Sequence, residues 1–236
     1  MASLAEHLVQ PLVVSVPGFR PSTHGFRFAN RFPPGPTVVL GPLDVRRLGF
    51  GDASAGLCGG MSLTVRDLFE AGVPVPADAE PPANGSPRFR SLVRRQVQSL
   101  DWLRVPLRLW AMQALDPDPA RTTIEREWPR IRAAIDAGQL AVLGLVRTTG
   151  LSPWRLAVNH QVLAYAYADA PGGVSVWVYD PNHPARDDVA LVITRTAAGA
   201  DVRQSTGEPI RGWRVLPWRR GPVRAWVTGG GSPAGS

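Results

Sequence analysis

Residues 56–62 read Gly56-Leu57-Cys58-Gly59-Gly60-Met61-Ser62, and Cys58 is the only cysteine of the chain. From here to Ala71 the apolar residues recur at helical spacing, and Gly72 suits the end of a helix. The N-terminus of a helix lowers the pKa of a cysteine and favours the reactive thiolate, so Cys58 is a candidate nucleophile. We expect Gly59 and Gly60, which have no side chain, to let a substrate approach the sulfur.

Two later segments carry candidate partners for this thiol. His160 begins a segment that alternates in polarity over 161–167, and Asp180 follows another strand-like segment over 174–179. The Pro171-Gly172-Gly173 turn between them predicts an antiparallel hairpin, which would bring His160 and Asp180 to one edge of a sheet. In a nucleophilic triad the imidazole carries the proton and the carboxylate orients the ring. The order Cys58, His160, Asp180 predicts such a triad, with Asn182 as an alternative third member.

The remaining sequence predicts an α+β fold. The apolar period changes from helical to alternating after Gly138, so a helical part precedes a run of strands. Residues 17–37 and 73–87 are rich in proline and are expected to be extended chain or loops. We expect helices at about 57–71, 87–100, 105–114 and 122–138, and strands at about 140–146, 161–167, 174–179, 189–194 and 213–218.

These motifs resemble those of the papain-like cysteine peptidase superfamily. The matching stretches are Gly56-Leu57-Cys58-Gly59-Gly60-Met61, Asn159-His160-Gln161-Val162-Leu163 and Tyr179-Asp180-Pro181-Asn182, within about residues 50–190. The chain looks closest to the bacterial peptidases that cleave bacteriocin leaders and to uncharacterised bacterial domains of similar pattern. The resemblance implies a papain-like fold: a helical part, whose central helix begins with the nucleophilic Cys58, packed on an antiparallel sheet that carries His160 and Asp180.

One position departs from the pattern of this family. The leader-processing peptidases carry a glutamine about six residues before the cysteine, whose side-chain amide helps to bind the oxyanion, whereas this chain has Asp52 there. An ionised carboxylate cannot donate that hydrogen bond. The backbone N–H of Cys58 remains, and Asn30 and Ser54 are candidate replacements for the missing donor. A working hydrolase and a catalytically weak binding module with the same fold therefore both stay open.

Composition argues against several other classes of protein. The chain has 236 residues, of which 44% are hydrophobic, so we expect a single domain over 1–226 and a flexible Gly/Ser/Pro tail over 227–236. The net charge of +7 comes from arginines that are mostly scattered among acidic residues, so nucleic acid is not an expected partner. No stretch approaches about 18 apolar residues and no signal-peptide pattern is present, which predicts a cytoplasmic protein without a membrane partner.

The cysteine and the histidines do not indicate a cofactor. Cys58, His160, Asp180 and His183 lack the short spacings of zinc motifs, so neither a metal nor another cofactor is expected. The expected function is a cysteine hydrolase, a peptidase or amidase, that attacks a peptide or another amide or thioester and forms an acyl-enzyme. A transferase, in which an amine replaces water, uses the same residues.

Overall fold

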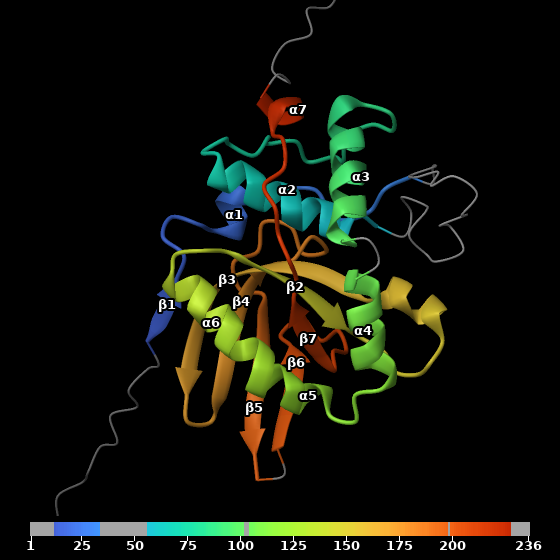
Figure 1. Ribbon diagram of the computed structural model, residues 1–236. Helices are drawn as coiled ribbons and strands as arrows, with labels where there is room; N and C mark the ends of the chain where they lie inside the picture. The colour runs from blue at the N-terminus through green and yellow to red at the C-terminus, as the bar shows by residue number, and fades with distance from the viewer. Residues whose placement is uncertain (1–11, 34–55, 102–103, 198, 228–236) are drawn as a thin grey trace, which may run out of the picture.

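The molecule has an α+β architecture, in which helices lie against a seven-stranded antiparallel sheet (Figure 1). The computed structural model describes residues 12–33, 56–101, 104–197 and 199–227. The helices are α1 (Pro21–His24), α2 (Cys58–Glu70), α3 (Pro87–Ser99), α4 (Arg104–Ala114), α5 (Pro119–Thr122), α6 (Trp128–Asp136) and α7 (Arg224–Val227). The strands are β1 (Val13–Ser15), β2 (Ala141–Val146), β3 (His160–Ala170), β4 (Gly173–Tyr179), β5 (Ala190–Thr196), β6 (Gly199–Gln204) and β7 (Gly212–Val215). The predicted α+β class is confirmed.

Strand β3 lies at the centre of the sheet. The strand order is β6-β5-β4-β3-β2-β7, and β1 pairs with β3 beyond the part that pairs with β2. On the other side β4 runs antiparallel to β3, with Leu163 opposite Tyr179. The start of β3 therefore lies beside the end of β4. His160 and Asp180 meet where these two neighbouring strands begin and end, as the hairpin pattern predicts.

Helix α2 is buried along most of its length. Every residue from Gly59 to Leu68 is buried, and the helix contacts α3 as well as β3. The apolar side chains of Met61, Val65 and Leu68 have no exposed surface. Each such side chain contributes about 1.5–3 kcal/mol when it is fully buried. The position of Cys58, the first residue of α2, is therefore fixed by the core.

The predicted elements lie within a few residues of their expected places, and the larger differences have local causes. The strand predicted over 213–218 ends at Val215, since Pro217 has no N–H to donate to a ladder. The helix predicted over 122–138 is divided by a π-helical turn, Thr123–Glu127. Within that turn the hydroxyl of Thr123 donates to the carbonyl of Pro119 and accepts the N–H of Trp213, which fastens the turn to β7.

The sequence predicts neither α1, β1 nor β6. Helix α1 lies in the proline-rich region expected to be extended or looping chain, and Pro21 occupies its first turn, where a missing N–H costs nothing. Strand β1 has only three residues and depends on its pairing with β3. Helix α7 ends at Val227, and the other residues of the predicted tail, 228–236, lie outside the described residues. No helix among the described residues combines the length and the hydropathy needed to cross a bilayer.

A C-terminal strap, residues 216–223, runs from β7 across α2 to α7 (Figure 1). The carboxylate of Asp67 on α2 accepts hydrogen bonds from Trp218 Nε1 and from the backbone N–H of Gly221, both at 3.0 Å. The same carboxylate is paired with Arg95 of α3, with 2.8 Å between Nε and Oδ2. One buried side chain therefore fastens the strap, α2 and α3 together.

We expect Asp67→Ala to lower the free energy of unfolding by about 3–5 kcal/mol, because it leaves the buried guanidinium of Arg95 without its counter-charge. Urea unfolding followed by tryptophan fluorescence measures this loss. Asp78→Ala is the matched control, since the Asp78 side chain is 53% exposed and its pair with Arg88 should contribute at most about 1 kcal/mol. Equal losses in the two variants would contradict the role given to Asp67.

Candidate active site

Cys58 is the first residue of α2, and the residue as a whole is partly exposed. The chain enters the helix through Gly56, whose φ of +89° is a backbone conformation that favours glycine. A remote side chain caps the helix, because Asn30 Oδ1 accepts the N–H of Leu57 at 2.6 Å. The helix start therefore presents both its partial positive charge and the thiol at one point.

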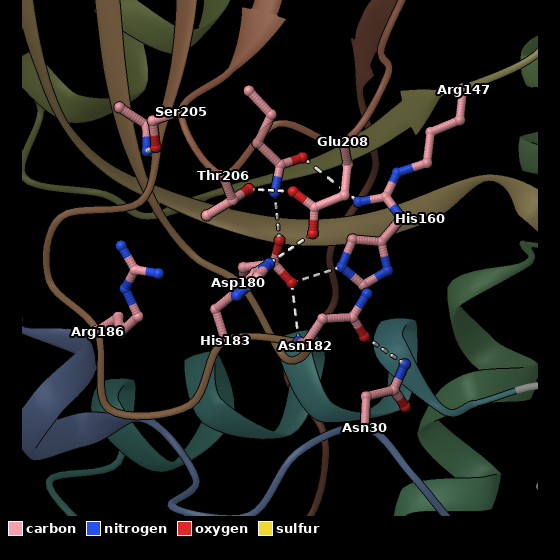
Figure 2. A network of polar contacts seen from close by, with 12 residues as sticks. Asn30, Arg147, His160, Asp180, Asn182, His183, Arg186, Ser205, Thr206 and Glu208 are labelled. Atoms are coloured by element: carbon pink, nitrogen blue, oxygen red, sulfur yellow. Dashed lines mark hydrogen bonds and ion pairs between the residues drawn. The ribbon is translucent and has the colours of Figure 1, made fainter.

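The imidazole of His160 is bonded to a fully buried carboxylate. His160 Nε2 lies 2.6 Å from Asp180 Oδ1, and the side chains are 4% and 0% exposed (Figure 2). The backbone N–H of Asn182 donates to the same Oδ1 at 2.8 Å. Gln204 Nε2 donates to the other oxygen, Oδ2, also at 2.8 Å. Both oxygens of Asp180 are thus engaged, and one of them faces the imidazole.

Each of the three groups shifts the pKa of its neighbour toward the charged form. Burial lowers the pKa of His160, but the charges of Asp180 and Cys58 raise it more, to about 9. Burial raises the pKa of Cys58, but the charge and hydrogen bond of His160 and the backbone N–H groups of Gln161 and Gly59 bring it below 9.0. Burial also raises the pKa of Asp180, and His160 and the N–H of Asn182 lower it to about 2. These shifts favour a thiolate beside an imidazolium.

The side chains of Cys58 and His160 lie close enough for each to shift the pKa of the other. Because His160 Nε2 faces Asp180, Nδ1 is the ring nitrogen that remains for the thiol. The imidazole thus lies between the sulfur and the carboxylate. The structure therefore brings Cys58, His160 and Asp180 together in the order that the sequence predicts.

The structure places two of the three candidate oxyanion and orienting residues, Asn30 and Asn182, beside the site. Asn30 lies between the helix start and the Asp180 turn: its Nδ2 donates to Asn182 Oδ1 at 3.2 Å, and its backbone N–H donates to the carbonyl of Pro181. Asn182 therefore contacts both Asn30 and Asp180 (Figure 2), but it is Asp180 that bonds His160. Ser54 and Asp52 lie outside the described residues.

The expectation for the two glycines after the cysteine is wrong. Gly59 and Gly60 are buried, and their surroundings are protein rather than an open approach to the sulfur. A Cβ at Gly59 would lie 2.4 Å from Ser99 Oγ, and a Cβ at Gly60 would lie 2.3 Å from the carbonyl oxygen of Leu92. These positions lack side chains because α2 approaches α3 closely there.

Sequence reasoning missed the outer residues of the site. Gln204 ends β6, a strand that the sequence does not predict, so nothing along the chain connects it with Asp180. Arg147 follows β2, and its Nη2 donates to Gln204 Oε1 at 3.3 Å. His183 Nε2 lies 2.6 Å from Glu208 Oε1. Among the described residues, no three His, Cys, Asp or Glu side chains are grouped as metal ligands would be.

No protein-family model matches the chain, and comparisons with curated proteins and with solved structures find no match. A functional assignment therefore depends on the geometry of the residues described above.

We expect alkylation of Cys58 by iodoacetamide to reach its half-maximal rate below pH 9.0, because the charge of His160 favours the thiolate. In His160→Ala the midpoint should move to higher pH, since the burial that disfavours the thiolate remains while the imidazolium is gone. Intact mass measured across a pH series checks both values, because the chain has one cysteine.

The matched control for this experiment is His24→Ala, which removes a histidine of α1. It should leave the alkylation midpoint unchanged. A midpoint that is the same in the parent and in His160→Ala would contradict the coupling between Cys58 and His160.

Proposed function

We propose that the chain is a papain-like cysteine hydrolase, a peptidase or amidase, whose triad is Cys58, His160 and Asp180. The observation that carries the proposal is the 2.6 Å contact between His160 Nε2 and Asp180 Oδ1, with Cys58 at a helix N-terminus and near enough to His160 for their charges to interact. The packing of α2 on an antiparallel sheet, with the nucleophile before the base in the chain, agrees with that family. The substrate would be a peptide or another amide or thioester.

The chemistry follows from the positions of the three groups. The thiolate of Cys58 attacks the substrate carbonyl carbon and forms a C–S bond, while the carbonyl electron pair moves to oxygen. As the carbonyl re-forms, the bond to the leaving group breaks, and His160 gives its proton to the departing amine or thiol. The neutral imidazole then takes a proton from water, which attacks the thioester and releases the acid and the thiol. Asp180 keeps the ring oriented through both steps.

Two donors are proposed for the oxyanion. The backbone N–H of Cys58 lies at the start of α2, where N–H groups have no partner within the helix. Asn30 lies beside it, since its Oδ1 holds the N–H of Leu57, the preceding residue. Its Nδ2 carries two hydrogens, and the bond to Asn182 uses one of them. Asn30 would therefore take the role that the glutamine has in the leader-processing peptidases.

Acylation by p-nitrophenyl acetate tests the proposed chemistry without knowledge of the natural substrate. We expect a burst of nitrophenolate, one acetyl group on Cys58 by intact mass, and a slower steady release. Cys58→Ala should abolish the burst, and His160→Ala should slow acylation at pH 7 by about 10²-fold or more.

Two other outcomes separate the alternatives. Acylation without steady release, in the absence and presence of added amines, would indicate a binding module that retains a reactive thiol. Steady release that appears only when a primary amine is added would indicate a transferase. An acylation rate no faster than that of the urea-unfolded chain would contradict a catalytic thiol.

Asn30→Asp tests the proposed oxyanion donor, because it keeps an oxygen for the N–H of Leu57 and removes the amide N–H groups. We expect the limiting acylation rate at high pH, where the thiol is fully ionised, to fall by about 10²–10³-fold. The free energy of unfolding should change little, since the helix cap remains. A limiting rate within a factor of about two of the parent would assign the oxyanion to other donors.

A further inference from the structure

Gln204 is a buried polar residue that contacts the triad from a distant strand. It ends β6 at the edge of the sheet, and it is 3% exposed. Its Nε2 donates to Asp180 Oδ2 at 2.8 Å, and its Oε1 accepts from Arg147 Nη2 at 3.3 Å. A chain of hydrogen bonds therefore runs from Arg147 through Gln204 and Asp180 to His160.

The amide suits this place because it is a neutral donor. A buried carboxylate needs partners for both oxygens, since an unsatisfied polar group in the interior destabilises the fold. A cation bound directly to Asp180 would compete with the imidazolium for the carboxylate charge. The amide of Gln204 satisfies Oδ2 and adds no net charge, so the full negative charge continues to face His160.

Arg147 decides which end of the Gln204 amide faces Asp180. A guanidinium can only donate hydrogen bonds, so it selects the amide oxygen and turns the amide nitrogen toward the carboxylate. The reversed amide would place two acceptors, Oε1 and Asp180 Oδ2, against each other.

We infer that Gln204 is a positioning residue of the triad, which holds Asp180 with Oδ1 toward His160, and that Arg147 sets the orientation of the Gln204 amide. The inference rests on the proposed function for its meaning in catalysis. It can nevertheless be tested without any turnover, because it concerns the imidazole pKa of His160, which can be measured directly.

Other charged groups near Asp180 stay in place when Gln204 is changed. His183 lowers the pKa of Asp180 through its charge, and it is paired with Glu208 at 2.6 Å. Thr206 donates a hydrogen bond to the other oxygen of Glu208 (Figure 2). With Arg147, His183 and Glu208 are the charged or titrating groups that face Asp180 and His160 from this side, and Gln204→Leu leaves all three unchanged.

The experiment measures the imidazole pKa of His160 by NMR titration in a Cys58→Ser background, where no thiolate contributes. We expect Gln204→Leu to lower that pKa by up to about one unit, because an Asp180 carboxylate that Gln204 no longer holds can turn away from the imidazole and then stabilises its charged form less. Arg147→Met keeps Gln204 but frees its amide, and it also removes a positive charge, which by itself raises the pKa of His160, so the lowering should be smaller than in Gln204→Leu. Gln139→Leu, at an exposed glutamine after α6, is the matched control and should not shift it.

The outcomes separate this inference from the proposed function. A titration of His160 that is unchanged in Gln204→Leu and in Arg147→Met overturns the inference, while the hydrolase proposal stands or falls with the acetylation burst. If Gln204→Leu does not fold, Gln204→Met, which is closer to glutamine in length and adds no charge, takes its place: a lowered pKa supports the inference and an unchanged pKa overturns it. With the thiol restored, the same variants should raise the alkylation midpoint of Cys58 by a matching amount.

Discussion

The approach of α2 to its neighbours is the constraint on which the site depends. At Gly59 and Gly60 the helix lies so close to Ser99 and to the backbone of Leu92 that no Cβ fits. One hydrogen bond crosses this contact, because Gln96 Oε1 on α3 accepts the N–H of Gly60 at 2.8 Å. The helix is thereby held at a fixed depth, and the thiol at its start can reach the imidazole at the start of β3.

The site is built where several elements end. Cys58 begins α2, His160 begins β3, Asp180 follows β4 and Gln204 ends β6. Where a helix begins or a strand ends, backbone N–H groups lack partners in the regular structure. Polar side chains accept these hydrogen bonds here: Asn30 accepts the N–H of Leu57, and Asp180 accepts the N–H of Asn182. The hydrogen bonds that end these helices and strands therefore also set the charges and positions of Cys58, His160 and Asp180.

The sequence predicts the contact between His160 and Asp180 but not the hydrogen bonds that surround it. The contact of His160 with Asp180 follows from a period of two and a Pro-Gly-Gly turn, both of which are local patterns; the catalytic roles of Cys58, His160 and Asp180 remain predictions. Gln204 reaches the site through strand pairings that are far apart in the chain, and a glutamine is not unusual where it stands; the sequence names Asn30 as a candidate donor but not its contact with Leu57. The glycines after Cys58 are visible in the sequence, but whether a glycine faces substrate or a packed helix depends on the tertiary structure.

The strap over α2 has a consequence for the order in which the molecule is completed. Asp67 and Trp218 are separated by 151 residues. At about 5–20 residues per second, a ribosome takes about 8–30 s to pass from one to the other. Within that interval the chain completes α3 and β3, which pack against α2, but not yet the segment that closes over the helix. The contacts of the strap with Asp67 can therefore form only after both packing partners of α2 have been made, so the strap closes over a helix that is already held from its other sides.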